Sequence, residues 1–299
     1  MNGRTKRKVV MIKRFAGIAG IIGIFMFFTA GVYAKQDSIQ IKGSDTMVNL
    51  GQAWAEAFME KYPGIFVAVT GGGSGTGIAS LLNGTCDICE SSRTIKEKEI
   101  ALARQKGIEP KEFTVGLDGL AVVVHPDNPV DKLTIGQLSR IFTGAITNWK
   151  EVGGKDSRIV VLSREVNSGT HVYFKEHVVR KNDPESNEEF AADALLMSSS
   201  QAIADEIAQN PQAIGYYGMG YISPHQKPVA VAKDADSTYV LPLIENVIDG
   251  RYAVSRPLLV YTNGEPKGLV KEFLDFVLSD EGQKIVLEID FVPIKPVKR

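Results

Sequence analysis

Cysteine and histidine are scarce in this sequence, and the usual catalytic motifs are missing. Its 299 residues include two cysteines and four histidines, and the histidines are scattered without metal-site spacing. No lysine follows the glycines of the 71–77 run as it would in a P-loop. The serine-nucleophile patterns G-x-S-x-G and S-x-x-K do not occur. We therefore expect no catalytic residues, no metal site and no cofactor.

Repeats, low-complexity tracts and Pro/Gly/Ser-rich linkers are also missing. The composition is that of a globular protein, with 44% hydrophobic and 23% charged residues. A chain of 299 residues is longer than a usual single domain, which leaves room for two lobes around a cleft. Because no linker separates them, we expect the chain to cross between the lobes more than once.

The first 34 residues are predicted to be an export signal. A basic, acid-free start is followed by the uncharged, largely apolar segment Phe15–Ala34. Val32 and Ala34 place small residues at −3 and −1 of a cleavage site after Ala34. The alternative is an uncleaved membrane anchor, because about 20 apolar residues can span a bilayer. The absence of cysteine near this boundary argues against a lipoprotein anchor. The basic residues are Arg4, Lys6, Arg7, Lys8, Lys13 and Arg14.

Cleavage would leave an acidic protein. The remaining chain has 28 basic and 35 acidic side chains, a net charge of −7. An acidic surface argues against nucleic acid as a partner, because binding to a phosphate backbone needs clustered Lys and Arg. A small anion would have to be held by local hydrogen-bond donors and not by the overall field.

The two cysteines form a C-x-x-C pattern, Cys86 to Cys89, with three interpretations. A thioredoxin-like pair normally lies at a helix start, and a metal site needs more ligands than the one neighbouring Asp. Residues 87–89 resemble a short strand, and in an extended strand the two Cα atoms would be about 10 Å apart, beyond disulfide reach. We favour the third interpretation, two buried thiols.

Strands and helices alternate along the chain, which favours an α/β fold with a parallel sheet covered by helices. The apolar patterns and the Gly and Pro residues that interrupt them give the following expectations. Strands are predicted at 38–42, 65–70, 87–89, 120–125, 159–162 and 258–261, and helices at 47–62, 78–83, 96–106, 134–142, 171–180, 188–210 and 267–278.

Three loops share one design, in which a strand ends, glycines and hydroxyl residues turn, and a helix begins. Helix starts have unpaired N–H groups and a partial positive charge, so they suit an anion. Each loop alone is equally compatible with ordinary capping by Ser or Thr. Arg164 adds a planar cation suited to an oxyanion. The loops are Gly43-Ser44-Asp45-Thr46-Met47, Gly73-Ser74-Gly75-Thr76-Gly77 and Asn167-Ser168-Gly169-Thr170.

These loops, in this order, together with Ser91-Ser92-Arg93 and the return segment Ser255-Arg256-Pro257-Leu258, resemble the periplasmic phosphate-binding proteins of phosphate ABC transporters, the PstS family. The resemblance covers nearly all of the chain after the signal. It implies a hinged, two-lobed α/β fold, the type II periplasmic binding protein fold, with dehydrated phosphate in the interlobe cleft. We expect lobe I at 38–121 and 250–299, and lobe II at 122–249.

The resemblance also implies site residues. Arg164 would supply the cation. Hydrogen bonds to phosphate would come from the three helix starts. Ser44 in the first loop is one expected site residue, and the donors carried over by position are Thr46, Met47, Ser74, Ser168, Gly169 and Thr170.

One position departs from the family, which places an Asp where this chain has Ser92. That Asp accepts the proton of bound phosphate and so disfavours sulfate. Asp118 is our first candidate for a replacement acceptor and Asp45 the second, although Asp118 could instead bond its own backbone in a turn. Arg93 is either a second ligand or a partner for a carboxylate.

The expected function is capture of inorganic phosphate in the periplasm by hinge closure, and delivery to an inner-membrane ABC permease, by a monomer without enzyme activity. Binding of sulfate, molybdate or tungstate is the nearest alternative. A secreted phosphate-ester hydrolase and a phosphate-sensing protein of the same fold are others.

Overall fold

The computed structural model describes residues 37–297 of the chain. The predicted export signal, residues 1–34, lies outside the described residues. From residue 37 to residue 297, no helix combines the length and the apolar character needed to cross a bilayer.

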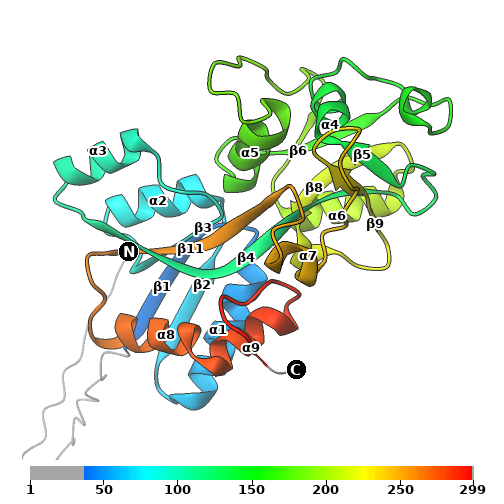
Figure 1. Cartoon of the computed structure of the whole chain (residues 1–299). Helices are drawn as coiled ribbons and strands as arrows, with labels where there is room; N and C mark the ends of the chain where they lie inside the picture. Colours follow the sequence, from blue (N-terminus) through cyan, green and yellow to red (C-terminus); the bar gives the residue numbers. More distant parts are fainter. Residues whose placement is uncertain (1–36, 298–299) are drawn as a thin grey trace, which may run out of the picture. The chain divides into compact units, whose positions relative to one another are not determined.

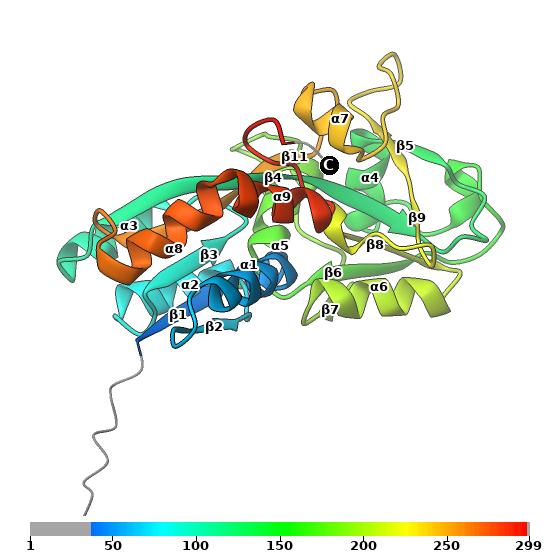
Figure 2. The same cartoon turned by 90° about the horizontal axis from the view of Figure 1, so that it is seen from below.

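Two long strands, β4 (Pro110–Val124) and β11 (Ser255–Asn263), link the two halves of a nine-stranded sheet. The first part of β4 pairs with β11, and its last five residues, Leu120–Val124, pair with β8 (Ala213–Gly218). Figures 1 and 2 show β4 running from one half of the molecule to the other. The sheet has the order β2-β1-β3-β11-β4-β8-β6-β7, with β9 also paired to β4.

The first half of the sheet holds three short parallel strands followed by antiparallel β11. Helices cover both of its faces. The aromatic ring of Phe58 packs on Phe273 and Phe276, which joins α1 to α8. The elements of this half are β1 (Ser38–Gly43), α1 (Val48–Lys61), β2 (Phe66–Thr70), α2 (Ser74–Leu82), β3 (Ile88–Ser91), α3 (Glu97–Gln105), α8 (Gly268–Leu278) and α9 (Asp280–Glu288).

The second half of the sheet has β6 parallel to both β7 and β8. Ala121 and Val123 of β4 belong to the apolar cluster that contains α6, while Val122 and Val124 belong to the large core with Phe142. This alternation is what a strand buried on both faces requires. The elements are β5 (Lys132–Thr134), α4 (Ile135–Phe142), η1 (Trp149–Val152), β6 (Val160–Arg164), α5 (Gly169–Phe174), η2 (Lys175–Val179), β7 (Leu195–Met197), α6 (Ser200–Gln209), η3 (Met219–Tyr221), β9 (Lys227–Pro228), β10 (Ala230–Ala232) and α7 (Ile244–Ile248).

The predicted α/β class is confirmed, but the sheet is mixed and not purely parallel. One predicted helix was wrong: in 188–210 only Ser200–Gln209 is helical, and β7 (Leu195–Met197) precedes it. The sequence pattern also missed β8, α9 and the first ten residues of β4. The second sequence helix begins at Ser74, four residues earlier than expected.

The prediction of two buried thiols is confirmed. Cys86 and Cys89 are both free and buried. Burial raises the pKa of Cys86 to about 12 and raises that of Cys89 well above its ordinary value. Both groups are therefore protonated at neutral pH, which makes them poor nucleophiles and poor metal ligands.

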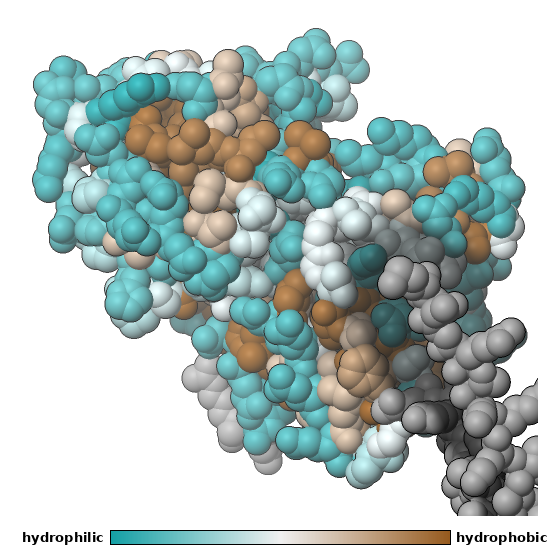
Figure 3. All heavy atoms as spheres, turned by 180° about the vertical axis from the view of Figure 1, so that it is seen from behind, coloured by the Kyte–Doolittle hydropathy of each residue, from teal (hydrophilic) through white to brown (hydrophobic). Residues whose placement is uncertain are grey.

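Hydrophilic residues cover most of the face shown in Figure 3, interrupted by apolar patches. The exposed large hydrophobic side chains of the described residues include Leu195 and Leu196 on β7 and Ile248 at the end of α7.

Candidate functional site: a buried hydroxyl cluster around Arg256

The first loop brings hydroxyl groups to the end of β1. Gly43 has a positive φ of 149°, and a Cβ there would collide with the backbone of Glu90. This close approach lets the Ser44 N–H donate to Glu90 O at 2.9 Å and the Ser44 hydroxyl donate to Ser92 Oγ at 3.0 Å. The loop therefore joins the carboxyl ends of two neighbouring parallel strands, which is where ligands bind in open α/β sheets.

The second loop places Ser74 at the first turn of α2. Gly73, with φ 88°, is the residue before the helix. Ser74 Oγ accepts a hydrogen bond from the Ser92 N–H at 3.0 Å and lies 3.3 Å from Ser92 Oγ. Ser92 thus lies between the hydroxyl of the first loop and that of the second.

The third loop approaches the other two at the start of α5. Gly169 is required there, because a Cβ would collide with the Ser74 hydroxyl and lie 2.7 Å from Ser92 Oγ. Thr170 Oγ1 is 2.8 Å from Thr46 Oγ1. The Ser168 hydroxyl caps the helix, since it accepts from the N–H groups of Thr170 and His171, and its own O–H can still donate.

Five hydroxyls from four chain segments therefore meet in one place, which we call the hydroxyl cluster. Each of the five side chains is at most 1% exposed. A hydroxyl can donate one hydrogen bond and accept two, so the cluster can serve either need of an oxyanion. The members are Ser44, Thr46, Ser74, Ser92 and Thr170.

Backbone N–H groups at the same three loops also lack acceptors among the described residues. Within residues 37–297, the N–H groups of Thr46, Ser74 and Gly169 make no hydrogen bond, and each comes from a different loop. The Met47 N–H is occupied, because it donates to Ser44 O at 3.0 Å. Free N–H groups at three helix starts are the arrangement that an anion satisfies.

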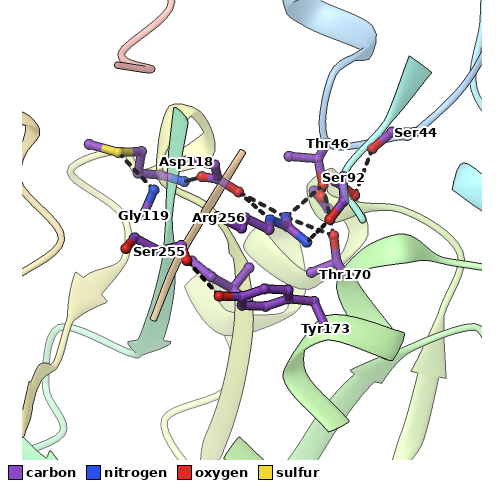
Figure 4. A network of polar contacts seen from close by, with 12 residues as sticks. Ser44, Thr46, Ser92, Asp118, Gly119, Thr170, Tyr173, Ser255 and Arg256 are labelled. Atoms are coloured by element: carbon purple, nitrogen blue, oxygen red, sulfur yellow. Dashed lines mark hydrogen bonds and ion pairs between the residues drawn. The ribbon is translucent and has the colours of Figure 1, made fainter. Parts of the chain in front are cut away.

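The cation at the cluster is Arg256, on β11. Its Nη2 donates to Thr170 Oγ1 at 3.0 Å and to Thr46 Oγ1 at 3.3 Å, and its Nη1 donates to Ser92 O at 3.1 Å. Figure 4 shows the guanidinium between these residues and Asp118. We did not predict Arg256 as a site residue. Its signal in the sequence was a charged side chain at the start of an apolar strand.

Asp118 faces Arg256 and not the hydroxyls. Its Oδ2 accepts from Arg256 Nε at 2.9 Å and Nη2 at 2.8 Å, and its Oδ1 accepts from the Met219 N–H at 2.9 Å. Both side chains are fully buried. The two carboxylate oxygens, which we expected to accept a ligand proton, are thus engaged with the protein.

Arg164 and Asp45 are paired with each other. Arg164 Nη2 donates to Asp45 Oδ2 at 2.7 Å, and Asp45 Oδ1 accepts from the Gly72 N–H at 2.8 Å. The remaining Arg164 bonds go to Met197 O, Ser198 O and the Ser200 hydroxyl. The pair joins the first loop to the end of β6, beside the hydroxyl cluster, and the Arg164 guanidinium makes no hydrogen bond to the cluster.

Asn167 joins the second and third loops in a similar way. The side-chain amide nitrogen of Asn167 donates to Gly72 O at 2.8 Å. The main-chain carbonyl of Asn167 accepts from the Gly75 N–H at 2.9 Å. Sequence reasoning placed Asn167 in the loop without a role. The Asp45–Arg164 pair and Asn167 together hold the three helix starts against one another.

Arg93 lies outside the cluster. Its two terminal nitrogens each donate to a carboxylate oxygen of Glu99 at 2.8 Å. From the sequence, Arg93 was either a second ligand or a partner for a carboxylate. In the structure it has a carboxylate partner, Glu99.

In the described part of the chain, no group of three or more His, Cys, Asp or Glu side chains is arranged to hold a metal ion. His171 is buried beside Ser163, and burial lowers the pKa of His171 to about 4, so it is neutral at pH 7.

Comparisons with known proteins agree with this geometry. Residues 29–281 match the family model described as a PBP superfamily domain. The chain is 36% identical over 265 residues to the phosphate-binding protein PstS of Bacillus subtilis strain 168, an alignment that covers 87% of this chain and 82% of that protein.

Two solved structures are similar throughout. A phosphate ABC transporter substrate-binding protein of Clostridium perfringens, solved with bound phosphate, has 36% identity and a TM-score of 0.77, covering 87% of this chain and 100% of the other. An ABC-type phosphate transport receptor of Vibrio cholerae has 32% identity and a TM-score of 0.68, covering 86% and 100%. The chain therefore belongs to the PstS family of phosphate-binding proteins, within the PBP superfamily, and has their two-lobed fold.

Proposed function

We propose that this protein binds inorganic phosphate and delivers it to an ABC importer. The observation that carries the proposal is the meeting of five buried hydroxyls and three free N–H groups around Arg256. Charge-assisted hydrogen bonds from a guanidinium, and neutral donors at helix starts, are the interactions that hold a dehydrated oxyanion. The phosphate-binding relatives, at 36% identity, support phosphate as that oxyanion.

In this site, we propose that Arg256 supplies the positive charge and that the three helix starts supply N–H donors. The Arg256–Asp118 pair is nearly neutral as a unit, so a dianion is held by dipoles and hydrogen bonds more than by net charge. Asp118 then acts through Arg256, whose guanidinium it orients. The hydroxyls of the cluster, Ser92 among them, accept the proton of bound phosphate, since both Asp118 oxygens are engaged.

We further propose that the protein acts after export, that residues 1–34 are removed, and that it works as a monomer that docks on a membrane permease without catalysing a reaction. The basic start and small-residue end of the first 34 residues support export. Asp45 belongs to lobe I (38–121 and 250–299) and Arg164 to lobe II (122–249). Opening of the two lobes would therefore break the Asp45–Arg164 pair, and closure would form it again.

Calorimetry of the protein without residues 1–34 tests whether phosphate is the ligand. We expect one phosphate per chain, with a dissociation constant of about 1 μM or lower. Sulfate, molybdate and arsenate are titrated in parallel. Stronger binding of sulfate or molybdate than of phosphate would leave an oxyanion-binding protein but would overturn phosphate as its ligand.

A further inference from the structure

Arg256 has an aromatic neighbour on the helix that supplies Thr170. Tyr173 lies in α5, three positions after Thr170, and residues three apart lie on the same face of a helix. Thr170 Oγ1 accepts from Arg256 Nη2 at 3.0 Å, and the guanidinium carbon lies 5.6 Å from the centre of the Tyr173 ring. A cation within about 6 Å of a tyrosine ring is attracted by its π electrons. One face of α5 therefore holds the guanidinium through two residues.

The Tyr173 hydroxyl contacts the strand that carries Arg256. It donates to Ser255 O at 2.5 Å, and Ser255 is the residue before Arg256 at the start of β11. Figure 4 shows the Tyr173 ring below the Arg256 side chain, with its hydroxyl directed toward Ser255. The ring thus acts on the side chain of Arg256, and the hydroxyl acts on the main chain from which that side chain starts.

The next turn of the helical segment holds Tyr173 in place. The ring of His177 stacks on the ring of Tyr173, with centroids 3.7 Å apart and an angle of 14° between the planes, and His177 Nδ1 lies 2.9 Å from Tyr173 O. Burial raises the pKa of Tyr173. Its hydroxyl therefore keeps its proton at neutral pH and can donate it to Ser255 O.

Tyr173 also helps to keep water from the guanidinium. It lines a cavity of about 500 Å³ that reaches Arg256 and Pro257 at the start of β11. The Arg256 side chain is nevertheless fully buried, while Tyr173 is half-buried. Interactions between charges are stronger where water is excluded. Removal of the ring would enlarge this cavity next to the cation of the hydroxyl cluster.

The contact crosses the proposed lobe boundary. Tyr173 belongs to lobe II and Arg256 to lobe I. The helix that carries Tyr173 begins at Gly169, whose N–H is one of the three free donors. An anion at the cluster needs this helix start and the guanidinium at a fixed separation, and Tyr173 connects the two.

We propose that Tyr173 is a positioning residue of the phosphate site, which orients the Arg256 guanidinium against the start of α5 and shields it from water without touching phosphate. The inference rests on the proposed function, because it assumes that phosphate binds at the hydroxyl cluster. If Tyr173 only packs the two halves together, its loss lowers stability and leaves the affinity of the folded protein for phosphate unchanged.

The test is calorimetry with inorganic phosphate, at low and at high salt, on the wild-type protein and three variants. Tyr173→Phe removes the hydroxyl, and Tyr173→Leu removes the ring as well. Tyr239→Leu is the matched control, because Tyr239 is also half-buried and its ring lies 5.0 Å from Lys132 Nζ, away from the cluster.

We expect Tyr173→Leu to weaken phosphate binding about tenfold or more, and Tyr173→Phe about threefold or less, because the phenylalanine keeps the ring over Arg256. Tyr239→Leu should bind phosphate like wild type. Salt should weaken binding more in Tyr173→Leu than in wild type, since water and ions then reach the guanidinium.

Phosphate affinity within about twofold of wild type in Tyr173→Leu would overturn the inference. Equal losses in Tyr173→Leu and Tyr239→Leu would also overturn it, because a general effect on the fold would explain both. If Tyr173→Leu does not fold, Tyr173→Met, which fills a similar volume without a ring, is judged by the same results. If the wild-type protein itself does not bind phosphate, the proposed function fails, whatever the variants do.

Discussion

One oxygen of Asp118 accepts two hydrogen bonds from the guanidinium of Arg256, and solvent reaches neither side chain. Burying two charges is costly unless their geometry is good and their remaining groups are hydrogen-bonded. Here the Met219 N–H donates to Asp118, and Thr170 Oγ1 and Ser92 O accept from Arg256. The pair therefore holds a guanidinium in a fixed orientation at the end of β3, where the three helix starts meet.

Arg256→Lys tests whether this guanidinium binds phosphate. Lysine keeps the charge but cannot bond Asp118, Ser92 and the threonines at once. We expect phosphate affinity to fall about a hundredfold or more, measured by calorimetry, with a folded circular dichroism spectrum. Arg251→Lys, an exposed arginine five residues earlier, is the control and should bind like wild type. Wild-type affinity in Arg256→Lys would remove Arg256 from the site.

The Asp45–Arg164 pair is tested by a double-mutant cycle. If Arg164 only holds the first loop in place, then Asp45→Asn and Arg164→Met should each weaken phosphate binding about tenfold, and the double variant should be no weaker than either single variant. If Arg164 contacts phosphate, Arg164→Met should cost far more than Asp45→Asn, and the losses should add.

The loops of the site could be predicted from the sequence because their signals are local. A strand end, a glycine and a hydroxyl residue before a helix can be read within five residues, and Ser44, Thr46, Ser74 and Thr170 do meet in the structure. The α/β class followed from the same alternation of strands and helices.

The partners of the charged residues could not be predicted, because each is far away in the sequence. Asp118 and Arg256 are 138 positions apart, and Asp45 and Arg164 are 119. Arg164 was interpreted as the cation from its place near Ser168, while Arg256 reaches the cluster only through the pairing of β11 with β4 and β3. The long β4 was underestimated because Gly116-Leu117-Asp118-Gly119 is typical of a turn, although Phe113, Val115 and Leu117 alternate as in a strand. Pairing with β11 continues the strand through these glycines.

Glu90 should make stability fall as pH rises. It is 1% exposed, and one of its carboxyl oxygens has no hydrogen-bond partner among the described residues. Burial raises its pKa from 4.5 to about 8. Between these values the unfolded chain has lost the proton and the folded protein keeps it, so the free energy of unfolding decreases with pH across this window, by about 5 kcal/mol.

Urea unfolding of Glu90→Gln at pH 5 and pH 9 checks this. The variant should lose less stability than wild type between the two pH values, because glutamine does not titrate. Glu60→Gln, an exposed glutamate on α1, should follow wild type. Parallel curves for wild type and Glu90→Gln would contradict a buried neutral Glu90.

The last prediction concerns the selectivity for phosphate over sulfate, which we expect to depend on the side chain at position 92. Phosphate near neutral pH keeps a proton that needs an acceptor, while sulfate has none, so a carboxylate at the site repels sulfate and accepts from phosphate. The Ser92 hydroxyl is uncharged, lies between Ser44 and Ser74, and can accept that proton without repelling sulfate. Ser92→Asp should therefore raise the ratio of phosphate to sulfate affinity about tenfold, or about 1.4 kcal/mol. Calorimetry with both anions measures the ratio, and Ser92→Asn, similar in size but uncharged, is the control. If Ser92→Asp and Ser92→Asn change both affinities equally, the side chain at this position does not face the ligand. In that case the acceptor is another hydroxyl of the cluster, and Thr46→Val and Thr170→Val are the variants that should then shift the ratio.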